Sequence, residues 1–106
     1  MKRLKIEGVD LTPAVELFDF LTYALRTLKP LIVFKNELRR QCFRLHDLCR
    51  NFEDEGLTES HEDVYLPLFD ALSFLTMGLR FPSVDLRLVS KCKDKLTEAM
   101  LIGGAS

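Results

Sequence analysis

A chain of 106 residues with 47% hydrophobic and 29% charged residues has the composition of one soluble globular domain. Its formal net charge of −1 gives no overall attraction to nucleic acid or to an anionic membrane, so either role would need a local cluster of cations. Three cysteines without a recognisable spacing argue against a secreted disulfide scaffold. We therefore expect a single domain over residues 1–106, in the cytoplasm and without a membrane partner.

The two ends of the chain differ from the rest. Leu4 and Ile6 alternate with polar residues, which indicates a short strand or an extended N-terminal arm over residues 1–10. Residues 103–106 contain two glycines and predict a flexible tail. Residues 1–10 lack the apolar core of a signal peptide, and no apolar run reaches the roughly 20 residues that span a bilayer. We expect neither export nor a membrane span.

A first helix is predicted from residue 12 to about residue 29. Thr12 offers a hydroxyl that can cap the helix, and Pro13 suits the first helical position. Pro30 ends the helix, because the residue before a proline avoids helical backbone angles.

A second helix is predicted from Pro30 to about Asp54, and Gly56 closes it in a C-cap role. Its apolar residues recur every three or four positions, which is typical of a helix with one buried face. The predicted buried face comprises Leu31, Phe34, Leu38, Cys42, Leu45, Cys49 and Phe52.

The third helix should begin near Thr58 or Ser60, and Gly78 and Pro82 bracket its end. Pro67 lies inside this segment and allows two interpretations. Either the helix kinks at Pro67, or a short turn precedes a helix that begins near Leu66.

The fourth helix is predicted to begin with Ser83 as its cap, to hold Asp85 in its first turn and to stop at Gly103. Four helices with short connections favour an all-α fold, an antiparallel four-helix bundle that can carry a short extended N-terminal arm. An orthogonal packing of the same helices is the alternative.

Cys42, His46 and Cys49 lie within eight positions of one another. Zinc takes thiolate and imidazole ligands, so these residues could form a metal or thiol sensor. Structural zinc usually needs a fourth ligand, which here would have to be Cys92 or His61. Both cysteines of the segment also fit the predicted buried face, and free cysteine is among the most buried residue types. We favour the buried interpretation, and we assign no metal and no cofactor.

The second helix carries several cations, which spread from the edge of its buried face across its solvent side. Phe43 points outward among them, and an aromatic ring within a cluster of cations is typical of nucleic-acid binding. Nearby carboxylates could instead pair with these cations on a solvated helix face, which we favour. Possible nucleic-acid contacts are Lys35, Arg39, Arg40, Phe43 and Arg44.

The first and third helices carry more apolar residues than a surface helix needs. The third helix leaves only Asp70, Ser73 and Thr76 as a polar stripe. Exposed apolar and aromatic patches mark protein interfaces. The predicted interface comprises Phe20, Tyr23, Leu66, Phe74 and Met77.

The leading hypothesis from the sequence is a small non-enzymatic protein-interaction module, such as a regulator, adaptor or inhibitor, that forms a homodimer. Nucleic-acid binding by the second helix and metal or thiol sensing at Cys42, His46 and Cys49 are the alternatives. No catalytic residue is assigned, because the sequence shows no phosphate-binding loop and no nucleophile motif.

Overall fold

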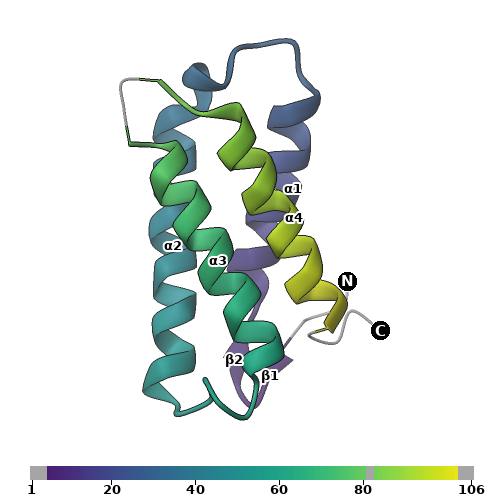
Figure 1. The fold of residues 1–106 in the computed structure, drawn as a ribbon, viewed down its shortest axis with the longest axis vertical. Helices are drawn as coiled ribbons and strands as arrows, with labels where there is room; N and C mark the ends of the chain where they lie inside the picture. The colour runs from purple at the N-terminus through teal and green to yellow at the C-terminus, as the bar shows by residue number, and fades with distance from the viewer. Residues whose placement is uncertain (1–4, 81–82, 103–106) are drawn as a thin grey trace.

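The computed structural model describes residues 5–80 and 83–102 and contains four α-helices preceded by a small hairpin (Figure 1). The described residues are mostly helical, as the sequence predicts. In chain order the elements are β1 (Lys5–Ile6), β2 (Val9–Asp10), α1 (Thr12–Arg26), the 3-10 helix η1 (Leu31–Phe34), α2 (Lys35–Asp54), α3 (Glu62–Gly78) and α4 (Leu86–Ile102).

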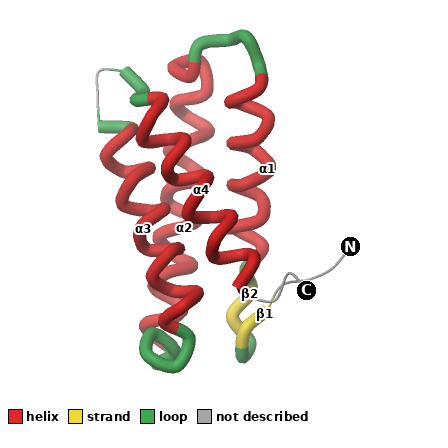
Figure 2. Tube along the Cα trace, turned by 45° about the vertical axis from the view of Figure 1, so that its right-hand side comes forward, coloured by secondary structure: helices red, strands yellow, loops and turns green. Residues whose placement is uncertain are grey.

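The helices lie alongside one another around a single core (Figure 2). In Figure 1 the α1–α2 connection, the end of α3 and the start of α4 lie at the upper end, and the α2–α3 connection and the hairpin lie at the lower end. Each helix contacts two main neighbours: α1 packs against α2 and α4, and α3 packs against α2 and α4. The most extensive contact joins α3 to α4.

The N-terminal segment forms a hairpin where the sequence indicates a strand or an extended arm. β1 and β2 pair antiparallel, with Ile6 opposite Val9, and both of these side chains are buried. Glu7 and Gly8 form the turn with positive φ angles of 47° and 89°, as tight two-residue hairpins require. Residues 1–4 of the predicted arm lie outside the described residues.

The start of α1 is organised by Asp10 rather than by Thr12. The Asp10 carboxylate accepts hydrogen bonds from the Thr12 backbone N–H (2.9 Å) and from the Thr12 hydroxyl (2.6 Å). The predicted capping role of Thr12 is therefore wrong, because its hydroxyl donates to the preceding aspartate. The helix ends at Arg26, earlier than predicted, because Thr27 already has extended backbone angles.

α2 begins at Lys35, since the segment after Pro30 forms the separate helix η1. Its end confirms the predicted role of Gly56. Gly56 has a φ of 68°, its N–H donates to the Glu53 carbonyl, and the Leu57 N–H donates to the Phe52 carbonyl. These two bonds form a Schellman motif that satisfies carbonyls at the helix end.

α3 runs without a break from Glu62 to Gly78, with Pro67 buried inside it. The prediction that a helix begins near Leu66 after a turn is therefore wrong, and so is a start near Thr58 or Ser60. Pro67 lies soon after the helix start, where the loss of one backbone donor still leaves the rest of the helix intact.

α4 begins one residue after Asp85, which caps it. The Asp85 carboxylate accepts bonds from the backbone N–H groups of Arg87 (2.9 Å) and Leu88 (3.2 Å). The predicted cap, Ser83, is exposed and precedes the cap position by two residues. The predicted stop at Gly103 and the tail 103–106 lie outside the described residues.

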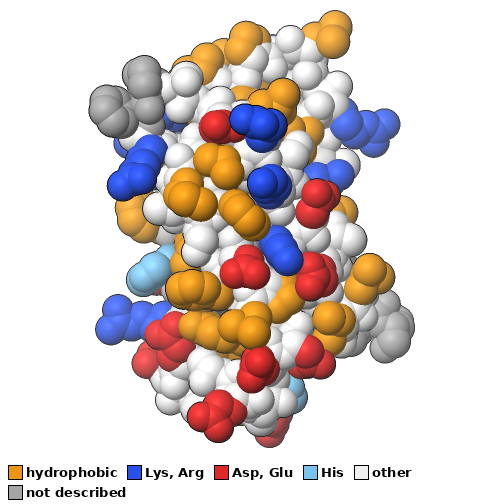
Figure 3. All heavy atoms as spheres, in the orientation of Figure 1, with side chains coloured by type: hydrophobic (Ala, Val, Ile, Leu, Met, Phe, Trp, Pro, Cys, Tyr) orange, Lys and Arg blue, Asp and Glu red, His pale blue; other side chains and the backbone are white. Residues whose placement is uncertain are grey.

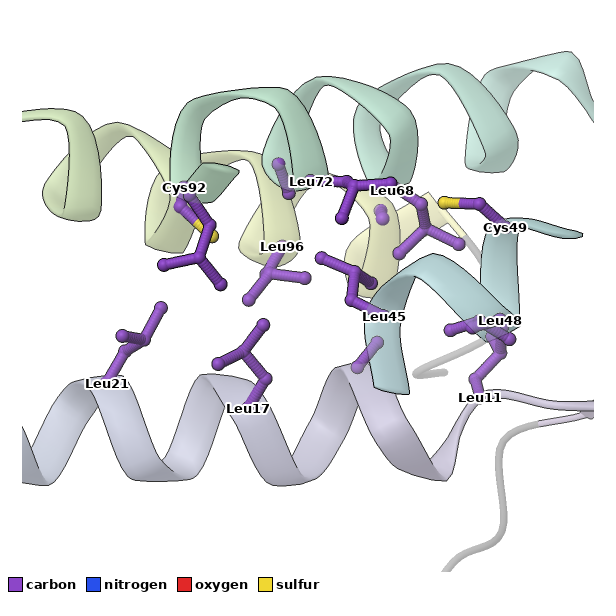
Figure 4. Packing of buried hydrophobic residues seen from close by; sticks show 14 of the residues in the cluster. Leu11, Leu17, Leu21, Leu45, Leu48, Cys49, Leu68, Leu72, Cys92 and Leu96 are labelled. Atoms are coloured by element: carbon purple, nitrogen blue, oxygen red, sulfur yellow. The ribbon is translucent and has the colours of Figure 1, made fainter. Parts of the chain in front are cut away.

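The core consists mainly of leucines from all four helices (Figure 4). α2 contributes a wider buried arc than predicted, because it packs against both α1 and α3. Figure 4 shows Leu48 on the side of Leu11 and Cys49 on the side of Leu68. The observed arc is also displaced to one side of the predicted one. The predicted face includes Cys42, which is only half-buried, and it omits Gln41, which is buried on the other side of the arc.

Candidate functional site

α3 exposes large apolar side chains on the side that faces away from the core. Leu66 is 45% exposed, and Phe69 and Met77 are each 44% exposed. The opposite side of the same helix is buried against α2 and α4. A helix at the surface of a globular protein normally turns polar residues to the solvent. The exposed apolar side of α3 is therefore the feature that most needs a functional explanation.

Six of the exposed and half-exposed residues of this segment follow a regular spacing of three and four positions. This spacing places them along one side of the helix, as in a helix–helix seam. We call this set the outer stripe of α3, and it comprises Asp63, Leu66, Asp70, Ser73, Met77 and, just past the helix end, Arg80. Figure 3 shows apolar side chains along the middle of the face on which α3 and α4 lie.

An open groove between α2 and α3 adjoins this stripe. It has a volume of about 390 Å³, and the nearly buried Leu72 and Leu79 contribute to its wall. Phe43 of α2 also lines it and is 66% exposed. A second depression of about 280 Å³ shares Leu72 and His46 with it, so the two form one groove along the α2–α3 contact.

The five predicted interface residues separate into two groups. Leu66 and Met77 belong to the outer stripe of α3. Phe74 lies on the α4 side of the same helix, half-buried, with the Lys91 ammonium 5.6 Å from its ring centre. Phe20 and Tyr23 form the other group.

That second group is an aromatic cluster between α1 and η1. Phe34 lies edge-on to Phe20 at 5.7 Å and to Tyr23 at 5.8 Å between ring centres. Phe20 is half-buried and packs against the core, whereas Tyr23 is 57% exposed. The sequence pattern predicts these rings and those of α3 in one interface, but α1 and α3 are not principal neighbours.

Phe69 belongs beside Leu66 and Met77, and the predicted interface omits it. Helical spacing could have found it, since Phe69 lies three positions after Leu66 and four before Ser73. Its ring centre lies 6.0 Å from that of Tyr65. The Phe69 ring therefore lies on the side of α3 that is nearer to α2.

The basic side of α2 is partly neutralised by neighbouring carboxylates. Arg40 forms an ion pair with Glu37, and Arg44 forms one with Glu16 of α1. The hydrogen bond from Arg40 lowers the pKa of Glu37, which keeps that carboxylate charged. Lys35 is half-buried, whereas Arg39 is exposed and lines the same depression as Phe43.

The structure does not gather Cys42, His46 and Cys49 into a metal site. In the described part of the chain, no group of three or more His, Cys, Asp or Glu side chains could hold a metal ion. Cys42 faces α3, with its Sγ 3.5 Å from the hydroxyl of Thr76, while Cys49 is buried.

All three thiols are free and are poor nucleophiles where they lie. Burial raises the pKa of Cys49 to about 12 and also raises the pKa values of Cys42 and Cys92. Only the thiolate attacks an electrophile or binds a metal, and burial keeps these groups protonated at neutral pH.

Within residues 5–80 and 83–102, every helix is too short or too polar to cross a membrane. Compared with protein-family models, with curated proteins and with solved structures, the chain gives no significant match.

Proposed function

We propose that this protein is a small non-enzymatic interaction module, an antiparallel four-helix bundle that binds a protein surface through the outer stripe of α3 and the adjoining Phe69. The observation that carries the proposal is the partial exposure of Leu66, Phe69 and Met77 on one side of one helix. Self-association is the mode of binding that we expect first. The role is that of a regulator, adaptor or inhibitor.

The composition of this surface supports binding to protein. Each of the three apolar side chains leaves nearly half of its surface in water, and covering that area would stabilise a complex by about 1 kcal/mol per side chain. Aromatic and methionine side chains are enriched in protein interfaces. The charged residues Asp63 and Arg80 at the two ends of the stripe supply a polar rim.

The groove beside the stripe extends the available surface. Phe43 projects from α2 at the groove, so a partner that covers Phe69 can also contact Phe43. A partner would then meet apolar side chains from two helices that are already fixed by the core. We place the module in the cytoplasm, where its three free thiols stay reduced.

The proposal can be tested by placing a photo-crosslinking residue at Met77 in cells that express the protein. The same crosslinking residue at Leu28 is the matched control. Leu28 is fully exposed but lies in the α1–α2 connection. We expect a crosslinked adduct of defined mass from position 77, none from position 28, and loss of the adduct when Leu66→Glu is added. Equal crosslinking from both positions, or an adduct that Leu66→Glu leaves unchanged, would contradict the proposal.

Nucleic-acid binding is a second candidate because one observation favours it. Phe43 is the most exposed aromatic ring among the described residues, and Arg39 lines the same groove. Binding of a short single-stranded oligonucleotide should then weaken steeply as salt is raised and should be lost in Phe43→Ala. Absence of binding at low salt would remove this candidate.

A further inference from the structure

We propose that the outer stripe of α3 pairs with the same stripe of a second copy of this chain, with the two α3 helices antiparallel. The twofold axis would pass between the two α3 helices, perpendicular to both and level with the midpoint between positions 71 and 72. This inference rests on the proposed interaction role and adds the identity of the partner, the orientation and the register.

The stripe is complementary to itself when it is reversed. In this register Leu66 lies opposite the partner's Met77, and Met77 lies opposite the partner's Leu66. At the ends, Asp63 lies opposite the partner's Arg80. Each pair is equally distant from the midpoint between positions 71 and 72, so one rotation satisfies all of them, as an isologous dimer requires.

The spacing of the stripe suits packing of one helix against another. Its members follow one another at intervals of three, four, three, four and three positions. This is the spacing of a helix–helix seam, in which side chains of one helix fit between those of the facing helix. Over the length of α3 the stripe stays on one side, so a straight partner helix can follow it.

The centre of the stripe is polar and would fix the register. Asp70 lies opposite the partner's Ser73, close to the axis. The Lys95 ammonium lies 3.9 Å from the Asp70 carboxylate, which offsets the charge of this aspartate. Polar residues at the centre of a helix–helix seam specify alignment, because a shifted seam would place them against the apolar side chains of Leu66 and Met77.

The overall distribution of charge favours the antiparallel orientation. On the face that Figure 3 shows, acidic side chains gather at the lower end and most of the Lys and Arg side chains lie in the upper half. The lower end holds Glu53, Asp54 and Glu55 at the end of α2 and Glu62 and Asp63 at the start of α3. Reversing one copy places this acidic end beside the basic end of its partner.

A parallel arrangement would instead bring like charges together. Asp63 would face the partner's Asp63, Asp70 the partner's Asp70, and Arg80 the partner's Arg80. Like charges that face each other across an interface disfavour the complex. The residues of the stripe thus discriminate between the two orientations as well as supplying apolar contact.

Disulfide trapping measures the orientation directly. Leu66→Cys and Met77→Cys proteins are prepared separately, mixed in equal amounts and oxidised, with the unsubstituted protein as the background control. In the antiparallel dimer a disulfide joins position 66 of one copy to position 77 of the other. Two copies of position 66 would lie about 16 Å apart along the axis, well beyond the roughly 4–7 Å between Cα atoms that a disulfide needs.

We therefore expect the mixture to form a disulfide-linked dimer containing both variants, and each variant alone to stay monomeric on a non-reducing gel. Crosslinking of each variant with itself would show a parallel dimer and overturn the inference. Absence of crosslinking in all three samples would overturn it as well.

A charge exchange provides a second, independent measurement. Asp63→Arg and Arg80→Asp should each weaken the dimer about tenfold, because each change replaces two attractive pairs by two repulsive ones. The double variant should regain the unsubstituted affinity, since it restores both attractive pairs with their charges exchanged. Asp94→Arg on α4 is the matched control, with the same change of charge outside the stripe, and should leave the dissociation constant unchanged.

The failure of this inference can be told apart from the failure of the proposed function. If light scattering finds only monomers while position 77 still crosslinks to another protein in a Leu66-dependent way, the stripe binds a different partner and the dimer is wrong. If position 77 gives no specific adduct at all, both proposals fall.

Discussion

The hydroxyl of Tyr65 donates a 2.5 Å hydrogen bond to the carboxylate of Glu53, and this bond joins the start of α3 to the end of α2. The Tyr65 ring also packs 6.0 Å from the ring of the buried Phe52. Partial burial, helped by the bond to Glu53, raises the pKa of Tyr65 to about 12. Tyr65 therefore fixes the two helices to each other close to the segment that connects them.

The alkaline titration of Tyr65 tests this arrangement. The chain has two tyrosines, so Tyr23→Phe leaves Tyr65 as the only phenol whose ionisation changes the ultraviolet absorbance. We expect a midpoint near pH 12, and a lower midpoint when Glu53→Gln removes the carboxylate. A midpoint at the ordinary value of 10.0 in the folded protein would contradict the hydrogen bond.

The same shift makes the stability depend on pH in a defined direction. The folded protein holds the protonated phenol more tightly than the unfolded chain does, so this contribution is complete below about pH 10 and is lost as the pH rises toward 12. In urea unfolding, the advantage of the unsubstituted protein over Tyr65→Phe should shrink across this range. An advantage that stays constant would show that the two states ionise alike.

Asp85 should be the residue that stabilises the start of α4. Asp85→Ala removes the acceptor for two backbone N–H groups and should cost about 1 kcal/mol in the free energy of unfolding. Asp85→Asn keeps an acceptor and should cost less. Ser83→Ala is the control and should have no measurable effect, and a loss from Ser83→Ala equal to that from Asp85→Ala would reverse this assignment.

Gln41 is a buried polar residue whose substitution should raise the free energy of unfolding. It is 6% exposed, its Nε2 donates to Glu37 at 2.8 Å, and its buried Oε1 has no hydrogen-bond partner among the described residues. Gln41→Met keeps the volume and removes the unsatisfied oxygen, so it should raise the free energy of unfolding by about 1 kcal/mol. Gln41→Glu should lower it, because it places a second carboxylate beside Glu37. A destabilised methionine variant would show that this oxygen is satisfied.

The three thiols should react slowly in the folded protein. Burial raises their pKa values, that of Cys49 to about 12, so the thiolate fraction is small at about pH 8. Mass spectrometry after iodoacetamide treatment should show little modification of Cys49 and Cys92, and slower modification of Cys42 than of the same residue in urea. Rapid modification of Cys49 in the native state would revive the thiol-sensor alternative.

The boundaries of the helices were predictable where one residue type decides them. Gly56 ends α2 with a positive φ, a conformation that other residues adopt at a cost. The capping residues were harder, because Asp10 and Asp85 lie close to Thr12 and Ser83 and the same chemistry is available to each. The choice depends on where the backbone turns, and the sequence pattern does not specify this to a single residue.

The buried side of α2 shows a second limit of prediction from the sequence. The recurrence of apolar residues predicts one seam, but α2 packs between α1 and α3, so its buried arc is wider and includes the polar Gln41. For the candidate site, Leu66 and Met77 of the apolar third helix are exposed, and their role in an interface stays a prediction. Phe20 and Phe74 are half-buried, because each packs against the core through a part of its ring that the pattern does not reveal.

The pattern of contacts between the helices has a consequence for how quickly the chain folds. Three of the four principal helix contacts join neighbours in the sequence, and the most extensive of them joins α3 to α4 across a short connection. Contacts between nearby segments need little loop closure, so such a chain is expected to fold in microseconds to milliseconds. We therefore expect the α3–α4 contact to form first and the docking of α1 on α4, which joins distant parts of the chain, to come last.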